Sequence, residues 1–483
     1  MTVETWSGWV ARRGTGGVGT RTHARFLAAL AVGLGVALPG AGAAQDVEEE
    51  FPGVELGLTY EVDYQPTLAV APFRGRLGGE RAASRVQNII ARDLRYSNRF
   101  RMIDGSGGAF QDYDELDYSF WDQLGVDWVV TGRVEGAGSR RFVLVLEVHD
   151  VVFGSQEAQH RFPIPDPDDE DFRMAVHVAS DAVVESILDE PGMAASRIAF
   201  SQRRDDGNQE LYLIDSDGEN LRRVTNHRSL SISPAWSPDG RRLAYTSYRT
   251  DYPRIYELDL QTGEERMVEV DRSGDQYTPS YHPDGDRVVF SIVGEGRSGI
   301  YTYDLREGCC LEEIVSSRWD EISPRFSPDG SSIVFNSNRL GVGTPQIYQM
   351  TASGDDQEVL SPYLYGEYGY FTSPDWSPDG ERVAFHGSVE PGGNHQILVA
   401  ELGGRQNRVV QLTSEGNNQD PRWAPDGRHI VYVGERSWGR GLFIVDSATG
   451  NTRTLVGGIR ARVPDWSPSL APLVEDRMGV VDR

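Results

Sequence analysis

The sequence predicts an α+β N-terminal domain followed by an all-β six-bladed β-propeller, and three observations support this prediction. A seven-residue phrase ending in Pro-Asp-Gly occurs five times, and a sixth copy ends differently. The copies start 45, 45, 50, 47 and 43 residues apart, a period typical of repeat folds. Upstream of the repeats, helical periodicity alternates with short apolar runs. The six copies begin at Pro234, Pro279, Pro324, Pro374, Pro421 and Pro464.

The first 44 residues have the pattern of a secretory signal peptide. Arginines at positions 12, 13, 21 and 25 precede an apolar stretch over residues 26–38, and small residues follow. Thirteen apolar residues with interrupting glycines are too few to cross a bilayer. We expect cleavage after Ala43 or Ala44 and export of the mature chain, without a lipid anchor because no cysteine lies near that site.

A smaller α/β domain is predicted over residues 60–190, after a flexible acidic segment at 45–59. Its first helix is expected over Glu80–Tyr96, where Val86, Ile90 and Leu94 fall on one face. A second long helix is expected over Phe172–Leu188, and Pro191-Gly192 marks the boundary. The remaining expected elements are strands at 67–73, 100–103, 126–134, 141–149 and 156–162 and a short helix at 119–124.

The propeller is predicted over residues 194–470, with four strands in each repeat. The aromatic residue of each phrase lies in the first strand, and Pro-Asp-Gly turns the chain into the second. Proline presets φ, aspartate bonds its own backbone, and glycine takes a positive φ. Repeated four-stranded units of this length are typical of propeller blades.

The two ends of the repeat region predict how the ring closes. Residues 196–226 supply three strands with no phrase before them, and the sixth phrase, at 463–467, is a first strand with none after it. Together they make one complete blade, which removes exposed sheet edges. Six blades result, and residues 471–483 are left as a C-terminal tail.

Several segments together resemble the TolB family, the periplasmic component of the Tol-Pal system of Gram-negative bacteria. They are LAVAPF from Leu68, IIARDLRYSNRF from Ile89, WDQLGVDWVVTGRV from Trp121 and PDWSPSL from Pro464, combined with the six phrases. The resemblance covers both domains in the same order. Propeller phrases alone are shared by many proteins, so the segments of the N-terminal domain make it specific.

The resemblance implies a protein-binding role without chemistry. It implies binding of the lipoprotein Pal at the propeller mouth and of TolA through the N-terminal domain, in a system that maintains the outer membrane and constricts the envelope during cell division. In the family the extreme mature N-terminus contacts TolA. Here that segment is the acidic QDVEEEF from Gln45, so a solubilising tail is an equal alternative.

Two enzymatic alternatives find no support in the residues. A peptidase with a related propeller needs a hydrolase domain with a G-x-S-x-G elbow, and the sequence contains no such motif. A metal-dependent lyase needs clustered histidines, whereas His282, His386, His395 and His429 fall at unrelated blade positions. His282 is expected to be a turn residue. We therefore predict no enzyme, no catalytic residues and no metal site built from these histidines.

The predicted partner surface is the ring of residues just before each phrase, at one mouth of the channel. It mixes carboxylates, tyrosines, amides and arginines, of which tyrosine and arginine most often anchor interfaces. Carboxylates there also suit a hard cation such as calcium, which stays open as an alternative. The ring consists of Ser231, Ser233, Asp275, Tyr277, Thr278, Asp320, Glu321, Ser323, Tyr370, Thr372, Ser373, Asn418, Gln419, Asp420, Arg460 and Arg462.

Net charge limits the possible classes of partner, and the two cysteines bear on the structure of one turn. A formal charge of −26 argues against nucleic acid and anionic membranes, although adaptation to salt would also produce it. We expect a monomer without direct membrane insertion. The adjacent Cys309 and Cys310 would close almost no loop if bridged, so we expect an unbridged or partly bridged turn without a functional role.

Overall fold

A computed structural model of the chain describes residues 65–103, 116–138, 141–340, 344–362, 369–403 and 408–478. All of these belong to one compact unit. The expected signal peptide and the acidic segment at 45–59 lie outside the described residues. Among the described helices, none is both long and apolar enough to cross a membrane.

The N-terminal domain contains the two long helices where the periodicity predicts them. Helix α1 spans Glu80–Tyr96 and α3 spans Phe172–Leu188. A short strand that the sequence analysis missed, β2, covers Arg74–Arg76. The other elements are β1 (Thr67–Val70), β3 (Arg101–Ile103), α2 (Tyr118–Gln123), β4 (Trp128–Gly136), β5 (Arg141–Asp150) and β6 (Ser155–Pro165).

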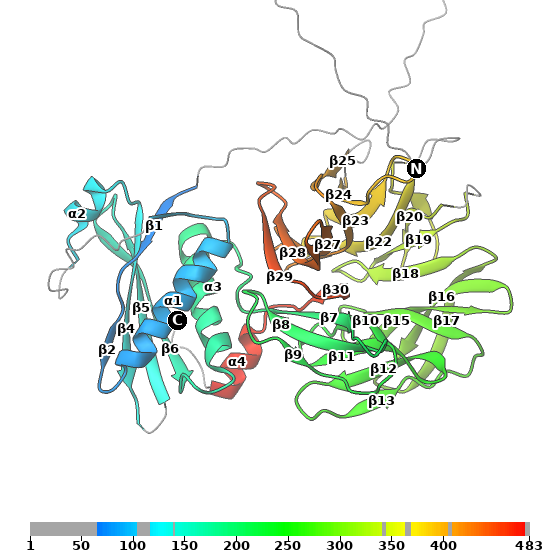
Figure 1. Cartoon of the computed structure of the whole chain (residues 1–483), viewed down its shortest axis with the longest axis horizontal. Helices are drawn as coiled ribbons and strands as arrows, with labels where there is room; N and C mark the ends of the chain where they lie inside the picture. Colours follow the sequence, from blue (N-terminus) through cyan, green and yellow to red (C-terminus); the bar gives the residue numbers. More distant parts are fainter. Residues whose placement is uncertain are drawn as a thin grey trace, which may run out of the picture. The chain divides into compact units, whose positions relative to one another are not determined.

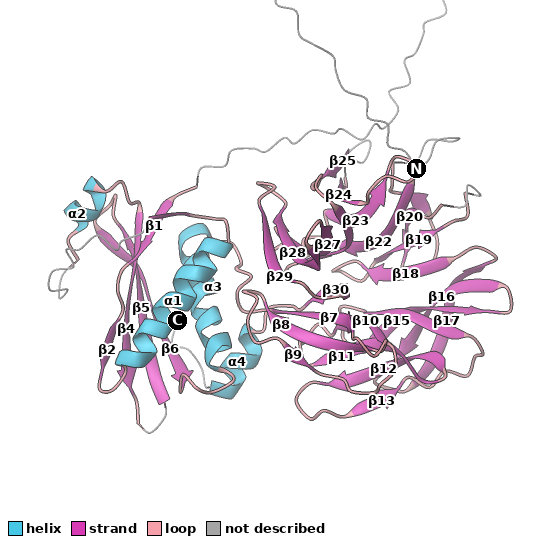
Figure 2. Ribbon diagram, viewed as in Figure 1, coloured by secondary structure: helices cyan, strands magenta, loops and turns pink. Residues whose placement is uncertain are grey.

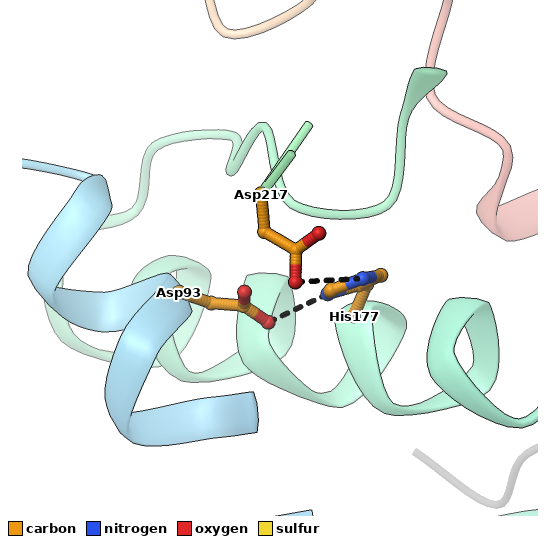
Figure 3. Close-up of side chains that lie close together, drawn as sticks. All are labelled: Asp93, His177 and Asp217. Atoms are coloured by element: carbon orange, nitrogen blue, oxygen red, sulfur yellow. Dashed lines mark hydrogen bonds and ion pairs between the residues drawn. The ribbon is translucent and has the colours of Figure 1, made fainter. Parts of the chain in front are cut away.

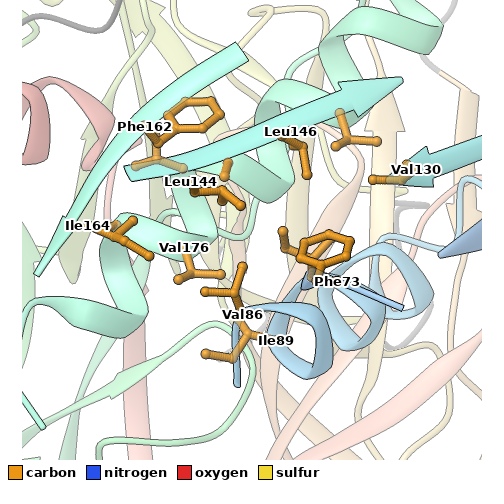
Figure 4. Packing of buried hydrophobic residues seen from close by; sticks show 14 of the residues in the cluster. Phe73, Val86, Ile89, Val130, Leu144, Leu146, Phe162, Ile164 and Val176 are labelled. Carbon is orange, nitrogen blue, oxygen red and sulfur yellow. The ribbon is translucent and has the colours of Figure 1, made fainter. Parts of the chain in front are cut away.

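These strands form a mixed sheet of order β3-β1-β4-β5-β6, with β2 also paired to β4. β1 pairs in parallel with both β3 and β4, whereas β4, β5 and β6 are antiparallel. Side chains of α1, α3 and the sheet share one apolar core, part of which is drawn in Figure 4. Val86 of α1, Val176 of α3 and Leu144 of β5 are fully buried there.

Residues 197–466 of the described chain form six four-stranded sheets, as predicted (Figures 1 and 2). Blades 1 to 5 follow chain order, and blade 6 has the order β30-β7-β8-β9. The first strands are β10 (Ser231–Trp236), β14 (Asp275–Tyr281), β18 (Glu321–Phe326), β22 (Tyr370–Trp376), β26 (Asn417–Trp423) and β30 (Ala461–Trp466). The second strands are β11 (Arg242–Thr250), β15 (Arg287–Gly294), β19 (Ser332–Ser337), β23 (Arg382–Ser388), β27 (His429–Arg436) and β7 (Arg197–Arg203). The outer strands are β12 (Tyr252–Asp259), β13 (Glu265–Met267), β16 (Arg297–Asp304), β17 (Cys309–Ser317), β20 (Gln346–Thr351), β21 (Glu358–Val359), β24 (Gln396–Glu401), β25 (Arg408–Gln411), β28 (Gly439–Asp446), β29 (Thr452–Gly457), β8 (Gln209–Asp215) and β9 (Arg222–Arg223).

Neighbouring blades are joined through the repeated phrase. In blade 1 the backbone N–H of Trp236 donates to the Asp465 carboxylate of blade 6 at 2.8 Å, and its indole Nε1 donates to the Asp465 carbonyl. In the same way Trp423 of blade 5 donates its backbone N–H to Asp375 of blade 4 at 2.8 Å. The phrase therefore links blades as well as building each one.

Two further expectations need correction or refinement. Cys309 and Cys310 form a disulfide, so the expected unbridged or partly bridged turn is wrong. Cys310 has a φ of 66°, and this left-handed turn brings the two neighbouring thiols together. The segment expected as a tail contains helix α4, Ala471–Met478, which packs against the core of the N-terminal domain.

Candidate functional site at the propeller mouth

The predicted ring lies at the start of the first strands and in the residues next to them. One residue in each blade, directly before the proline of the phrase, has a left-handed backbone with φ between 43° and 58°. The register of each first strand shifts at this point. The six residues, which we call the left-handed ring, are Ser233, Thr278, Ser323, Ser373, Asp420 and Val463.

A left-handed conformation is costly for residues other than glycine. It is least unusual for aspartate and least tolerated by a β-branched residue such as Val463. The same strain recurs in all six blades, and strain of this kind is often retained at functional sites. The register shift at this point is a β-bulge, which changes the direction of the side chains that precede the phrase.

The mouth lies at the opposite end of the first strands from the Pro-Asp-Gly turns. Two of those turns contact the N-terminal domain or the segment of α4. Asp426, in the turn of blade 5, lies 3.8 Å from Arg99 Nη2, and Gly240, in the turn of blade 1, lies against Leu470 beside α4. A first strand of six residues spans ~20 Å, which separates these contacts from the mouth.

The ring residues divide into accessible and buried groups. Asp320, Arg460 and Arg462 are exposed, and Asp275, Tyr277, Tyr370 and Gln419 are half-buried. By contrast Ser231, Glu321 and Asn418 are fully buried. The Glu321 carboxylate is bound by Arg339 at 2.7 Å. Replacing the fully buried Glu321 would leave the half-buried Arg339 guanidinium without this carboxylate, so Glu321 supports the blade rather than offering a free contact to a partner.

The neck of the channel carries charges that the sequence analysis missed. The residue after each phrase proline is Ala235, Ser280, Arg325, Asp375, Arg422 and Asp465, and the last four form one cluster. Arg325 Nη2 lies 2.7 Å from Asp465 Oδ1, and Arg422 Nε lies 3.5 Å from the same oxygen. Arg325 Nε lies 3.9 Å from Asp375 Oδ1. Reading the position after the proline would have revealed this cluster.

These charges are shielded from solvent and compensate one another. The four side chains are between 5% and 15% exposed. Arg325 and Arg422 border a cavity of about 120 Å³ that is lined by most of the left-handed ring. Burial raises the pKa of Asp375 although Arg325 and Arg422 oppose the shift. Both carboxylates already bind guanidinium groups, so the neck residues do not fit a calcium ion.

Two histidines that were expected at unrelated blade positions lie together at the mouth. The rings of His386 and His395 are 5.2 Å apart between centroids, and Tyr370 stacks on His395 at 4.9 Å. Asp420 donates its backbone N–H to His386 Nδ1 at 3.0 Å. Burial lowers the pKa of His386 to about 4 and also lowers that of His395. The two imidazoles are therefore uncharged at neutral pH, with His386 buried and His395 half-buried beneath Tyr370.

Two family models match the chain. The model described as the TolB beta propeller domain matches residues 184–470, and the model of the TolB amino-terminal domain matches residues 54–157. The chain belongs to the TolB family. This family is not enzymatic, which confirms the prediction that the chain is no enzyme.

Individual relatives agree with this assignment. The Tol-Pal system protein TolB of Polaromonas sp. is 33% identical over 204 residues, which cover 42% of this chain and 46% of the relative. The same protein of Thioalkalivibrio sulfidiphilus is 32% identical over 220 residues, or 44% and 50% of the two chains. The chain thus spans about half the length of the curated relatives it matches. The crystal structure of TolB from Acinetobacter baumannii superposes with a TM-score of 0.72 at 26% identity, covering 84% of this chain and 97% of that one.

Proposed function

We propose that this TolB chain is a periplasmic adaptor that binds the lipoprotein Pal at the propeller mouth and TolA through its N-terminal domain. In this role it helps to maintain the outer membrane and to constrict the envelope during cell division. The proposal includes removal of residues 1–44 on export, an acidic segment at 45–59, an adaptor domain at 60–190 and a binding propeller at 194–470. It requires no cofactor, nucleic acid or membrane insertion.

The observation that carries the Pal-binding role is the strained ring at the mouth. Six consecutive blades keep a left-handed residue at the same position, although such a backbone is unfavourable outside glycine. Around this ring lie accessible aspartates, tyrosines and arginines, including Asp275, Tyr277 and Arg462. Tyrosine and arginine are common interface anchors, and mixed charges give specificity.

The test is binding of purified Pal to the mature chain by calorimetry. A double variant, Tyr277→Ala with Arg462→Ala, removes two accessible mouth side chains and no buried ion pair. We expect its affinity to fall at least tenfold, equivalent to about 1.4 kcal/mol. Binding at the wild-type affinity would place the interface elsewhere.

The TolA-binding role is tested separately, by deletion of the acidic segment that precedes the N-terminal domain. Removing the acidic segment at 45–59 from the mature chain decides between the two alternatives: loss of TolA binding would assign the contact to this segment, and Pal binding should be unchanged. If TolA binding persists, the contact lies on the folded domain and the acidic segment is a solubilising tail. That result would also leave the Pal proposal intact.

A further inference from the structure

A buried cluster of charged side chains joins the N-terminal domain to the propeller (Figure 3). It contains Asp93 of α1, His177 of α3 and Asp217 in the turn between β8 and β9. The three side chains are at most 2% exposed. No residue of the mouth takes part among the described contacts, so the cluster is separate from the proposed binding site.

His177 lies between the two carboxylates. Its Nδ1 is 2.7 Å from Asp93 Oδ2, which also accepts a hydrogen bond from Ser180 Oγ at 2.7 Å. On the other side of the ring, Nε2 lies 3.8 Å from Asp217 Oδ2. Nε2 and the second oxygen of Asp93 have no hydrogen-bond partner in the described structure. A doubly protonated imidazole would therefore attract a carboxylate from each domain at once.

The surrounding charges favour a proton over a metal ion. Ligand atoms of the three residues lie within 4.8 Å of one another, which would suit a small cation. However, Arg92 Nη2 lies 2.5 Å from Asp217 Oδ2, and Arg173 contacts the same oxygen. Two guanidinium groups on this carboxylate would repel a divalent cation. The other charged or titratable groups around the cluster are Tyr96, Asp181, Asp215, Glu219 and Arg453.

The carboxylates around His177 decide the charge of its imidazole. Burial by itself would lower the pKa of His177, but Asp93, Asp217 and Asp215 overcome this and raise it. Arg453 reaches the cluster from β29 and lies over the Tyr96 ring at 4.2 Å. Burial lowers the pKa of Arg453 to about 10, so it keeps its charge near neutral pH.

We propose that His177 is a pH-sensitive latch, whose imidazolium holds the N-terminal domain on the propeller by lying between Asp93 and Asp217. Loss of the proton removes the imidazolium charge between two carboxylates that belong to different domains and leaves Arg92 and Arg173 as the cations of the N-terminal domain on Asp217. The contact then weakens, and the linker at residues 189–196 becomes more accessible. This inference does not depend on the identity of any partner.

The direction of the pH effect follows from the raised pKa. Below the ordinary histidine pKa of ~6.5, the latch contributes fully to the stability of the contact between the domains. This contribution is lost as the pH rises through the pKa of His177 in the folded protein. Asp181 acts in the same direction, because burial raises its pKa to about 7 against the N–H groups of Ala194 and Ala195. A variant of His177 is therefore needed to separate the two effects.

The experiment is limited proteolysis of the linker in the mature chain at about pH 6 and about pH 9. A peptide of the linker sequence corrects for the pH dependence of the protease. We expect cleavage of the wild type to be at least about fivefold faster at the higher pH, the lower end of typical coupling energies. His177→Gln should lower this ratio at least about twofold, and the pH dependence that remains in the variant belongs to Asp181.

Two controls keep the outcome decisive. His160→Gln alters a histidine that bonds Ser186 within the N-terminal domain and should keep the wild-type ratio. Asp217→Asn changes only the propeller side and should raise cleavage already at the lower pH. A wild-type ratio near one, or an unchanged ratio in His177→Gln, would overturn the proposal. So would thermal stabilisation of the wild type by excess Zn²⁺ that His177→Gln abolishes, because the cluster would then be a metal site.

Discussion

Trp466 donates a hydrogen bond from its indole Nε1 to Ser196 Oγ at 2.8 Å, across 270 residues of sequence. The two residues come from the two chain segments that together make blade 6. Trp466 also stands opposite Ile198 in the antiparallel pair of β30 and β7. The ring is thus closed by side-chain as well as backbone bonds.

Replacing Trp466 by alanine should weaken the closure of blade 6 and lower the free energy of unfolding. The side chain is 6% exposed, and burying such a residue typically contributes ~3–5 kcal/mol to the free energy of unfolding. Urea denaturation should register this loss. Trp438→Ala is the matched control, since Trp438 is 57% exposed and should cost under ~1 kcal/mol. Equal effects of the two replacements would contradict the closure.

Relieving the strain at Val463 should stabilise the chain. Val463 has a φ of 43°, and asparagine tolerates this region better than a β-branched residue. We expect Val463→Asn to raise the free energy of unfolding by ~1 kcal/mol. Val410→Asn in β25 is the control, because its φ is not left-handed and the change should destabilise. A loss of stability at Val463 as large as at Val410 would argue against strain there.

The charge cluster at the neck should be sensitive to loss of one member. Asp465→Asn leaves Arg325 and Arg422 with Asp375 as the one remaining carboxylate of the cluster, in a site shielded from solvent. Breaking a buried pair in this way costs ~3–5 kcal/mol, measurable by chemical denaturation. Asp476→Asn removes an exposed partner of Arg241 and should cost under ~1 kcal/mol. A small effect at Asp465 would mean that water reaches the neck.

Asp426 should contribute to acid stability. Bonds from His429 and from the backbone of Arg428 overcome burial and lower the pKa of Asp426 to about 2. A lowered carboxylate pKa stabilises the fold above ~4, and the contribution is lost as the pH falls toward 2. Asp426→Asn should therefore remove ~2 kcal/mol at about pH 5 and flatten the decline below it. Asp251→Asn, at an exposed turn, should retain the wild-type slope in the same titration.

Much of the fold could be predicted because its signals are local and repeated. The Pro-Asp-Gly turns gave the blade count, and the apolar faces gave both long helices with their ends. β2 and α4 were missed because three residues or one short helix carry too little periodicity. The Cys309–Cys310 bridge was missed because the prediction considered only the short loop that the bridge would close. It could not show that a left-handed residue brings two neighbouring cysteines together.

The site was predicted only in outline for a similar reason. Position in the repeat locates a residue along a strand, but burial depends on contacts between strands. Glu321 and Asn418 occupy ring positions yet point into blade networks with Arg339 and Gln396. His386 and His395 lie together because β23 pairs with β24, and their separation in the sequence does not reveal this pairing.

The central claim, that the mouth binds the partner, is tested most directly by titrating purified Pal into the mature chain. The measured quantity is the dissociation constant of the Tyr277→Ala, Arg462→Ala variant relative to wild type. The matched control is Met267→Ala with Arg306→Ala, two exposed residues on the outer edges of blades 1 and 2. We expect at least a tenfold loss for the mouth variant and none for the control. Wild-type affinity in a folded mouth variant would contradict the account.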